Sequence, residues 1–212
     1  VLSDSSGERT FLHCLGANGI FSERDIDYSV IEKSKIVFVA GCMLMPSFDG
    51  EGCAEFLRKA KKMGKTTALD TAWDDTGKWM EKLEDSMPYI DYFMPSLDEA
   101  RQLSNKRTPE NIAEFFFGKG VGHVVIKLGK DGCYFQESAG SQGHYLPTYK
   151  VEAVDTTGAG DSFCAGFVYG ISKNMSMEES CALANAVGAH CVMEMGATTG
   201  IKSYAETLKL IV

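Results

Sequence analysis

The sequence lacks the cysteine and histidine spacings that hold metal ions. No two of its seven cysteines are separated by two residues, and no two of its four histidines stand at a ligand spacing. An odd number of cysteines, several within apolar stretches, is also not the framework of a disulfide-stabilised secreted domain. We therefore exclude a zinc site and predict that the cysteines are reduced core residues of a cytoplasmic protein.

The chain also lacks long apolar runs and an excess of basic residues. No stretch approaches the ~18 apolar residues that a membrane helix needs, so we expect no membrane partner. The 29 acidic residues outnumber the 21 basic ones and give a net charge of −8, which argues against a nucleic-acid surface. Phosphate ligands are compatible with this charge, because backbone N–H groups at the start of a helix bind anions.

Short β-rich runs alternate with helical patterns along the chain. Strands are predicted over Lys35–Ala40, Lys65–Leu69, Tyr89–Met94 and His123–Lys127, and helices over Gly52–Lys62, Gly77–Leu83, Asp98–Leu103 and Ile112–Phe117. An antiparallel pair over 132–137 and 144–149 and two helices over 160–172 and 177–194 follow. The alternation predicts one α/β domain over residues 1–212, with a doubly wound, mostly parallel sheet and helices on both faces. In such sheets, ligands bind at the carboxyl ends of the strands.

The segment Asp155–Phe163 has the sequence DTTGAGDSF and joins an extended stretch to an apolar helix. Its two glycines let the backbone approach a ligand closely. The first N–H groups of the helix have no intrahelical partner, and the helix dipole adds partial positive charge, so a hole for phosphate oxygens is predicted. Asp161 stands beside this hole, where a carboxylate can orient and deprotonate an attacking hydroxyl. The alternative is an Asp that only complements the helix dipole.

DTTGAGDSF resembles the C-terminal signature of the ribokinase-like (PfkB) family of carbohydrate kinases almost letter for letter. Other segments resemble parts of the same family: Ser6–Thr10 the stretch after its lid, Ile90–Pro95 with Glu99–Ala100 its Mg-linked segment, Ile126–Gly132 its nucleotide-contacting strand and turn, and Gly196–Ala197 the loop after its long C-terminal helix. The resemblance thus covers almost the whole chain and implies a ribokinase-like fold.

By that resemblance, the chain comes from an ATP-dependent sugar kinase, a phosphotransferase with an alcohol group as acceptor. Asp161 is then the catalytic base, and the anion hole is formed by Gly158, Ala159 and Gly160. The family implies ATP and Mg²⁺ as cofactors, with K⁺ as a further candidate. A small-molecule sugar is the implied partner, and a homodimer is a further expectation because the family often assembles through its lid.

The remaining site residues are also carried over from the resemblance. The ATP site takes Lys127, Gly129 and Gly132, with Asn185 either near the adenine or on a helix surface. Glu99 holds Mg²⁺ through water, and the monovalent cation site takes Asp155, Thr157, Cys191 and Gly196. The loop Asp70–Asp75 either borders the phosphate end of the nucleotide site or is a solvated turn with Trp73 packed beneath it.

The chain departs from the family pattern in two places. Where the family usually has Asn-x-x-Glu, this sequence has Ser96-Leu97-Asp98-Glu99, so the affinity or geometry of the metal can differ. The chain begins at Val1, and we expect it to match the C-terminal two-thirds of the family, with the N-terminal part and lid missing. A nucleoside kinase of the same family, or a non-catalytic nucleotide-binding protein, are therefore alternatives.

Overall fold

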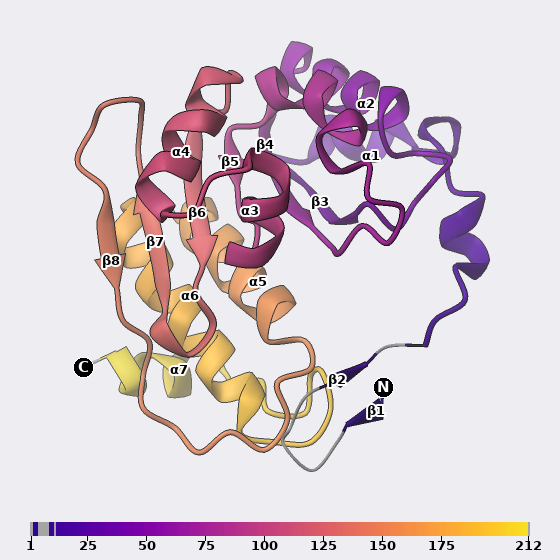
Figure 1. Ribbon diagram of the computed structural model, residues 1–212. Helices are drawn as coiled ribbons and strands as arrows, with labels where there is room; N and C mark the ends of the chain where they lie inside the picture. The colour runs from indigo at the N-terminus through magenta and orange to yellow at the C-terminus, as the bar shows by residue number, and fades with distance from the viewer. Residues whose placement is uncertain (1, 4–8, 11, 212) are drawn as a thin grey trace.

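The computed structural model describes residues 2–3, 9–10 and 12–211 of the chain. Within these residues the main sheet has six strands, in the order β3-β4-β5-β6-β7-β8 (Figure 1). Their bounds are β3 Ile36–Cys42, β4 Thr66–Thr71, β5 Tyr92–Phe93, β6 His123–Lys127, β7 Cys133–Gln136 and β8 His144–Leu146. Strands β3 to β6 pair in parallel, and β7 and β8 add to the edge of the sheet as antiparallel strands. The predicted mostly parallel sheet is confirmed, together with its antiparallel pair.

Helices cover both faces of this sheet (Figure 1). One face carries α2 (Glu51–Lys62), α3 (Leu97–Ser104) and α4 (Pro109–Gly118), and the other carries α5 (Ala159–Ser172) and α6 (Met177–Val192). The strands alternate between two buried clusters: Leu69 packs with the first group of helices, and its neighbour Ala68 packs with α5 and α6. Successive strand residues point to opposite faces, so the sheet is buried on both sides as predicted.

Shorter elements complete the described part of the chain. They are β1 (Leu2–Ser3) and β2 (Arg9–Thr10), which pair in a separate antiparallel sheet, α1 (Tyr28–Lys33), and α7 (Tyr204–Ile211), which packs on α6. The family resemblance predicted over Ser6–Thr10 falls partly on residues 6–8, which lie outside the described residues. Among the helices that the structure describes, none is both long and apolar enough to cross a lipid bilayer.

Helices α5 and α6 approach each other closely because of small residues. A Cβ atom added at Gly166 would lie 2.9 Å from Ala184 Cα, and one added at Gly170 would lie 2.6 Å from Ser180 Oγ. Helix α6 begins with a capping box, in which Ser176 Oγ accepts from Glu179 N and Glu179 Oε2 accepts from Ser176 N. The close approach at the two glycines packs α6 against α5 on the face of the sheet that carries the DTTGAGDSF segment.

The helix predicted over Gly77–Leu83 is wrong. The chain forms 3-10 turns there, at Trp79–Lys82 and Glu84–Tyr89, and the shortened strand β5 follows. The Asp74 carboxylate accepts hydrogen bonds from Thr76 N and Trp79 N at 3.1 and 2.7 Å. A side chain that binds nearby backbone N–H groups competes with an α-helix, and Trp79 is held at φ +42°.

The cysteines follow the prediction with one exception. Six of the seven are buried, and all of them are free thiols. Cys14 is exposed, so its predicted place in the core is wrong. It lies before the first large element that packs on the sheet, in a stretch where Leu12 and Ile20 are also exposed.

Candidate active site

The predicted site residues gather at the carboxyl ends of the parallel strands. Asp70 and Lys127 stand at the ends of β4 and β6, and the ammonium group of Lys127 reaches the Asp70 carboxylate. Glu99 in the first turn of α3 accepts a hydrogen bond from Thr71 Oγ1 at 3.1 Å. Gly160 in the first turn of α5 lies against Lys127, whose Nζ would be 3.4 Å from a Cβ added at residue 160. The residues of four elements therefore meet at one edge of the sheet.

The start of α5 has the geometry that the glycines predict. Gly158 is the N-cap residue with φ +76°, and a Cβ added there would lie 2.6 Å from the Ala197 carbonyl oxygen, so a side chain is excluded. The N–H of Ala159 donates to the Thr156 carbonyl at 3.2 Å, within the turn. The Ala159 amide of the predicted anion hole is therefore engaged within the turn, and Gly158 and Gly160 carry the other two amides.

Asp161 is the third residue of α5 and is exposed. Its carboxylate is one helical turn before Cys164, and its negative charge contributes to the raised pKa of that thiol. The predicted base is thus accessible to solvent and stands in the same turn of the helix as Gly160. An exposed carboxylate in the first turn is also favoured by the helix dipole.

Lys127 and Asp70 form a buried ion pair that the sequence did not reveal. Lys127 Nζ lies 2.7 Å from both oxygens of Asp70, and Asp70 is only 4% exposed. Burial raises the pKa of the Asp70 carboxyl to about 6, against the opposing effect of Lys127. Burial lowers the pKa of Lys127, but the acidic groups around it, Cys164 and Asp70 first, raise it above its ordinary value. The only hint in the sequence is an aspartate at the end of a buried strand, which needs a partner.

Glu99 is both a capping residue and a candidate metal residue. Its Oε2 accepts from Ser96 N at 2.9 Å, and Ser96 Oγ accepts from Glu99 N at 3.4 Å, which makes a capping box at the start of α3. Ser96, which stands where the family has Asn, is therefore part of the helix cap. The Glu99 carboxylate supplies the hard oxygen atoms that Mg²⁺ prefers, and it is already ordered by its hydrogen bonds with Thr71 Oγ1 and Ser96 N.

The turn after β6 is fixed by glycine and by Asn185. Gly132 has φ +91°, and a Cβ added there would lie 2.1 Å from the Leu146 carbonyl oxygen. Asn185 Nδ2 donates to the carbonyls of Leu146 and Pro147 at 3.2 and 3.3 Å. Asn185 is 3% exposed, so the interpretation as a helix-surface amide is wrong. Its amide instead holds the end of β8 and Pro147 against α6, where the Leu146 carbonyl lies close to Gly132.

The four residues predicted to hold a monovalent cation lie close together: Asp155 and Thr157 before α5, Cys191 at the end of α6 and Gly196 after it. Asp155 accepts from Thr157 N and from Gly196 N, both at 2.9 Å. The Cys191 thiol lies 3.5 Å from the Thr157 carbonyl oxygen and 3.3 Å from that of Ala197. Carboxylate and carbonyl oxygens therefore converge beside the start of α5, and these hard donors fit an alkali cation.

The structure contradicts one of the two interpretations of the loop Asp70–Asp75, that of a solvated turn with Trp73 packed beneath it. Trp73 is half exposed and meets the ring of Trp79 edge-on at 4.9 Å, so it is not packed beneath a solvated turn. Asp74 is buried and paired with Lys82 at 2.6 Å. The loop is thus held by its own side chains at the carboxyl edge of the sheet, and its Thr71 hydroxyl donates to Glu99.

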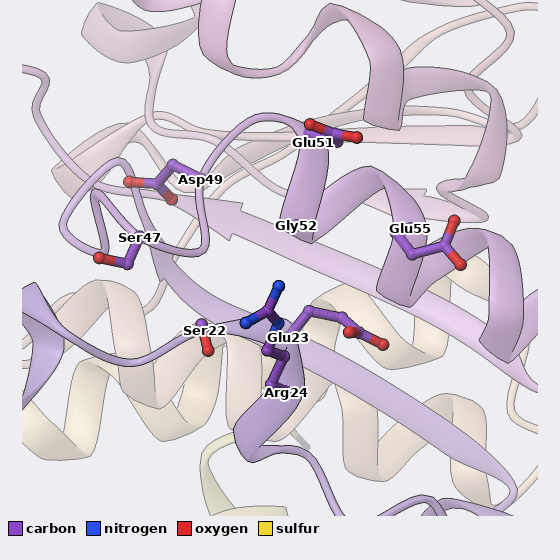
Figure 2. Close-up of a pocket in the computed structure, with 8 residues that line it drawn as sticks. All are labelled: Ser22, Glu23, Arg24, Ser47, Asp49, Glu51, Gly52 and Glu55. Carbon is purple, nitrogen blue, oxygen red and sulfur yellow. The ribbon is translucent and has the colours of Figure 1, made fainter.

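A pocket of about 560 Å³ lies elsewhere, between residues 22–24 and the start of α2 (Figure 2). Figure 2 shows the Arg24 side chain reaching into it from below Gly52, among Glu23, Glu51 and Glu55. Glu23 is paired with Lys59, and Glu55 with Arg58, at 2.7 and 2.6 Å. These carboxylates already have partners, so we assign this pocket no part in the chemistry at α5.

Comparison with known proteins gives one consistent result. The family model described as pfkB family carbohydrate kinase matches residues 1–203. A 2-dehydro-3-deoxygluconokinase of Bacillus subtilis is 34% identical over 66% of this chain and 45% of its own length. The crystal structure of a ribokinase from Thermotoga maritima superposes with a TM-score of 0.82 at 27% identity, over 99% of this chain and 67% of that one.

An Arabidopsis thaliana ribokinase, whose structure holds ribose and ATP, is 26% identical over 88% of this chain and 59% of that one, with a TM-score of 0.74. The chain therefore spans roughly half to two thirds of the length of these relatives.

Proposed function

The chain belongs to the pfkB family of carbohydrate kinases, and from this premise we propose that the protein transfers the γ-phosphate of ATP to a hydroxyl group of a sugar. The observation that carries the proposal is the first turn of α5. It places the glycine amides of the anion hole and the exposed carboxylate of Asp161 within three residues of each other. Both groups that hydroxyl phosphorylation needs, an anion site and a base, are thus presented by one helix end.

In the proposed reaction, the sugar hydroxyl lies at Asp161, which orients it and accepts its proton as the oxygen attacks the γ-phosphorus. The bond from the γ-phosphorus to the bridging oxygen breaks, and ADP leaves with the electron pair. The amides of Gly158 and Gly160 stabilise the negative charge of the transferred group, and the dipole of α5 adds to this effect. Mg²⁺, when bound, neutralises charge on the phosphates, and Glu99 orients a water of that ion.

The nucleotide is proposed to lie along the turn after β6. Gly129 and Gly132 let the backbone turn closely there, and Asn185 acts by holding the segment 146–148 on the adenine side. Lys127 borders the phosphate end of this site from the sheet, beneath Gly160. A monovalent cation among Asp155, Thr157, Cys191 and Gly196 would fix the loops that carry the anion hole.

The cellular compartment and the oligomeric state of the protein can also be proposed. We place it in the cytoplasm, because six buried free thiols suit a reducing compartment. A homodimer is expected from the family, and analytical ultracentrifugation of the full-length protein measures it.

The first experiment is ADP release by the full-length protein with MgATP, across a panel of sugars and nucleosides. We expect turnover with a sugar, and a kcat lower by about 10³-fold in Asp161→Asn, because a general base contributes about 10² to 10⁴. Glu178→Gln removes a first-turn carboxylate from α6 and is the matched control, with turnover unchanged. Unchanged turnover in both variants would reduce Asp161 to a dipole partner.

The same panel separates the alternative functions. Turnover with a nucleoside and not with a sugar would keep the chemistry and change the acceptor class. Binding of MgATP without turnover on any compound would favour a non-catalytic nucleotide-binding protein and contradict the proposed activity.

A further inference from the structure

The ion pair between Asp70 and Lys127 is the main charged feature of the site that the proposed reaction does not use directly. It joins β4 to β6 across the carboxyl end of β5, which lies between them in the sheet. The two side chains are 5% and 12% exposed. Lys127 Nζ contacts both carboxylate oxygens, so its ammonium group is fixed in position and its charge is compensated.

The pair also contacts the first two turns of α5. Cys164 Sγ lies 3.4 Å from Asp70 Oδ2 and 3.7 Å from Lys127 Nζ. The Lys127 ammonium would be 3.4 Å from a Cβ at Gly160, so it lies directly beneath the backbone of the proposed anion hole. Glycine at this position therefore lets a charged side chain from the sheet reach the helix start.

We propose that Asp70 and Lys127 are a positioning pair for the anion hole: Lys127 supports the first turn of α5 from beneath, and Asp70 cancels its charge so that ADP is not held too tightly. The proposal rests on the proposed function, since it concerns the phosphate site of the same reaction. It assigns the nucleotide contacts to the backbone of α5 and gives Lys127 an indirect role.

Substitution of Asp70 alone changes the net charge beside the proposed anion hole. Asp70 faces Lys127 from β6, Cys164 from α5 and, at longer range, Glu99 from α3. Replacing Asp70 by Asn keeps the size of the side chain but leaves the Lys127 ammonium without its partner, next to the amides that hold phosphate. An uncompensated charge within several ångströms, at intermediate effective dielectric, changes the affinity for an anion by at least about tenfold.

The test is the Kd of MgADP at pH 7, measured by isothermal titration calorimetry on the full-length protein. We expect Asp70→Asn to bind MgADP about tenfold more tightly than the unaltered protein, with a lower KM for ATP and a lower kcat because ADP leaves more slowly. Its stability should fall at the same time, since a buried lysine loses its counter-charge. A variant that is less stable but binds more tightly is not the result of a merely structural contact, which would weaken both.

Two further variants complete the test. The double variant Asp70→Asn/Lys127→Met removes both charges but keeps an unbranched side chain beneath the first turn of α5, so we expect its Kd to return to within about threefold of the unaltered protein. Asp91→Asn removes the partner of Lys61 at the opposite, amino-terminal edge of the sheet, and should leave the Kd unchanged. Loss of affinity in the double variant would show that Lys127 contacts the nucleotide itself and would overturn the proposal.

If Asp70→Asn does not fold, Lys127→Met carries the test. It removes the ammonium group but keeps an unbranched side chain beneath the hole, and without Lys127 burial raises the pKa of the Asp70 carboxyl further. The Kd of MgADP at pH 7 should therefore stay within about threefold of the unaltered protein. A loss of affinity of about tenfold or more would show that Lys127 contacts the nucleotide itself and would contradict the proposal. Absence of MgADP binding in the unaltered protein would overturn the proposed function, and the pair's role with it, whereas binding that is unchanged or weaker in Asp70→Asn overturns the positioning role alone.

Discussion

Single carboxylates shape the loops at the carboxyl edge of the sheet. After β4, Asp74 accepts hydrogen bonds from Thr76 and Trp79 and pairs with Lys82. After β3, Asp49 accepts from the N–H groups of Met43 and Met45 at 3.0 and 2.9 Å. Met43 and Trp79 both have positive φ, which is rare for bulky residues and persists only where other contacts impose it.

Asp74 offers a prediction about pH. Its hydrogen bonds to Lys82 and Thr76 outweigh the effect of burial and hold its pKa well below the usual range. A carboxyl with a lowered pKa in the folded state stabilises the protein above its unfolded pKa of ~3.8, and this contribution is lost as the pH falls. Asp74→Asn should therefore lower the free energy of unfolding by about 2 kcal/mol at pH 7.

Urea unfolding at a series of pH values checks this expectation. The difference between Asp74→Asn and the unaltered protein should shrink below about pH 4, where the carboxyl in the unfolded chain takes up its proton. The exposed neighbour Asp75 provides the control, since Asp75→Asn should have little effect at any pH. A difference that stays constant down to pH 3 would assign the loss to packing and not to charge.

At the scale of elements, the sequence patterns predicted those strands and helices whose positions are set by neighbouring residues. The buried runs before Gly41 and Leu128 predicted β3 and β6, and the helical pattern over Gly52–Lys62 predicted α2 to within one residue. The turns at 79–89 were missed because one side chain, Asp74, competes with the helix. The glycine motif located the start of α5. The Asp70–Lys127 pair could not be derived, because its residues are 57 positions apart and meet only in the folded sheet.

The contact between α5 and α6 depends on glycine at the crossing. Gly170→Ala would place a methyl group 2.6 Å from Ser180 Oγ and 2.9 Å from Ser180 Cα, so the helices must separate. We expect a loss of about 1–3 kcal/mol in the free energy of unfolding, typical of an overpacked core. Gly118→Ala in α4, where nothing lies within 4 Å of the added Cβ, should stabilise by up to about 1 kcal/mol.

Denaturant unfolding of both variants measures the contrast. Equal effects of the two substitutions would mean that helix propensity, and not the close approach of α5 and α6, sets the response. Because α5 carries the anion hole on its first turn, weaker MgADP binding in Gly170→Ala would also show that the site depends on this packing.

At the scale of the whole molecule, the site lies at the carboxyl edge of the sheet, between the buried clusters on its two faces. The parallel strands bring Asp70 and Lys127 to the edge from the middle of the sheet, α3 brings Glu99 from one face, and α5 brings Gly160 from the other. A ligand at this edge therefore contacts both layers of helices. Its binding energy should stabilise the fold as a unit and not only one loop.

Thermal unfolding with nucleotide tests this expectation. A ligand that binds only the folded state adds about 2.7 kcal/mol at a concentration of 100 Kd, so MgADP should raise the Tm of the full-length protein by roughly 5–10 °C. Asp161→Asn should show the same shift, because its carboxylate is proposed to act on the acceptor hydroxyl. A shift that is lost in this variant would place Asp161 in nucleotide binding.

The positions of the thiols allow local unfolding of the protein to be followed by cysteine alkylation. Cys14 is the exposed cysteine, and the six others are distributed over β3, α2, β7, α5 and α6, on both faces of the sheet. A small alkylating reagent therefore modifies the native protein at Cys14 alone. Each further modified cysteine shows that the helix or strand that carries it has become accessible to the reagent. Local fluctuations of α2, of α5 or of α6 can thus be followed separately by peptide mass, without any engineered label.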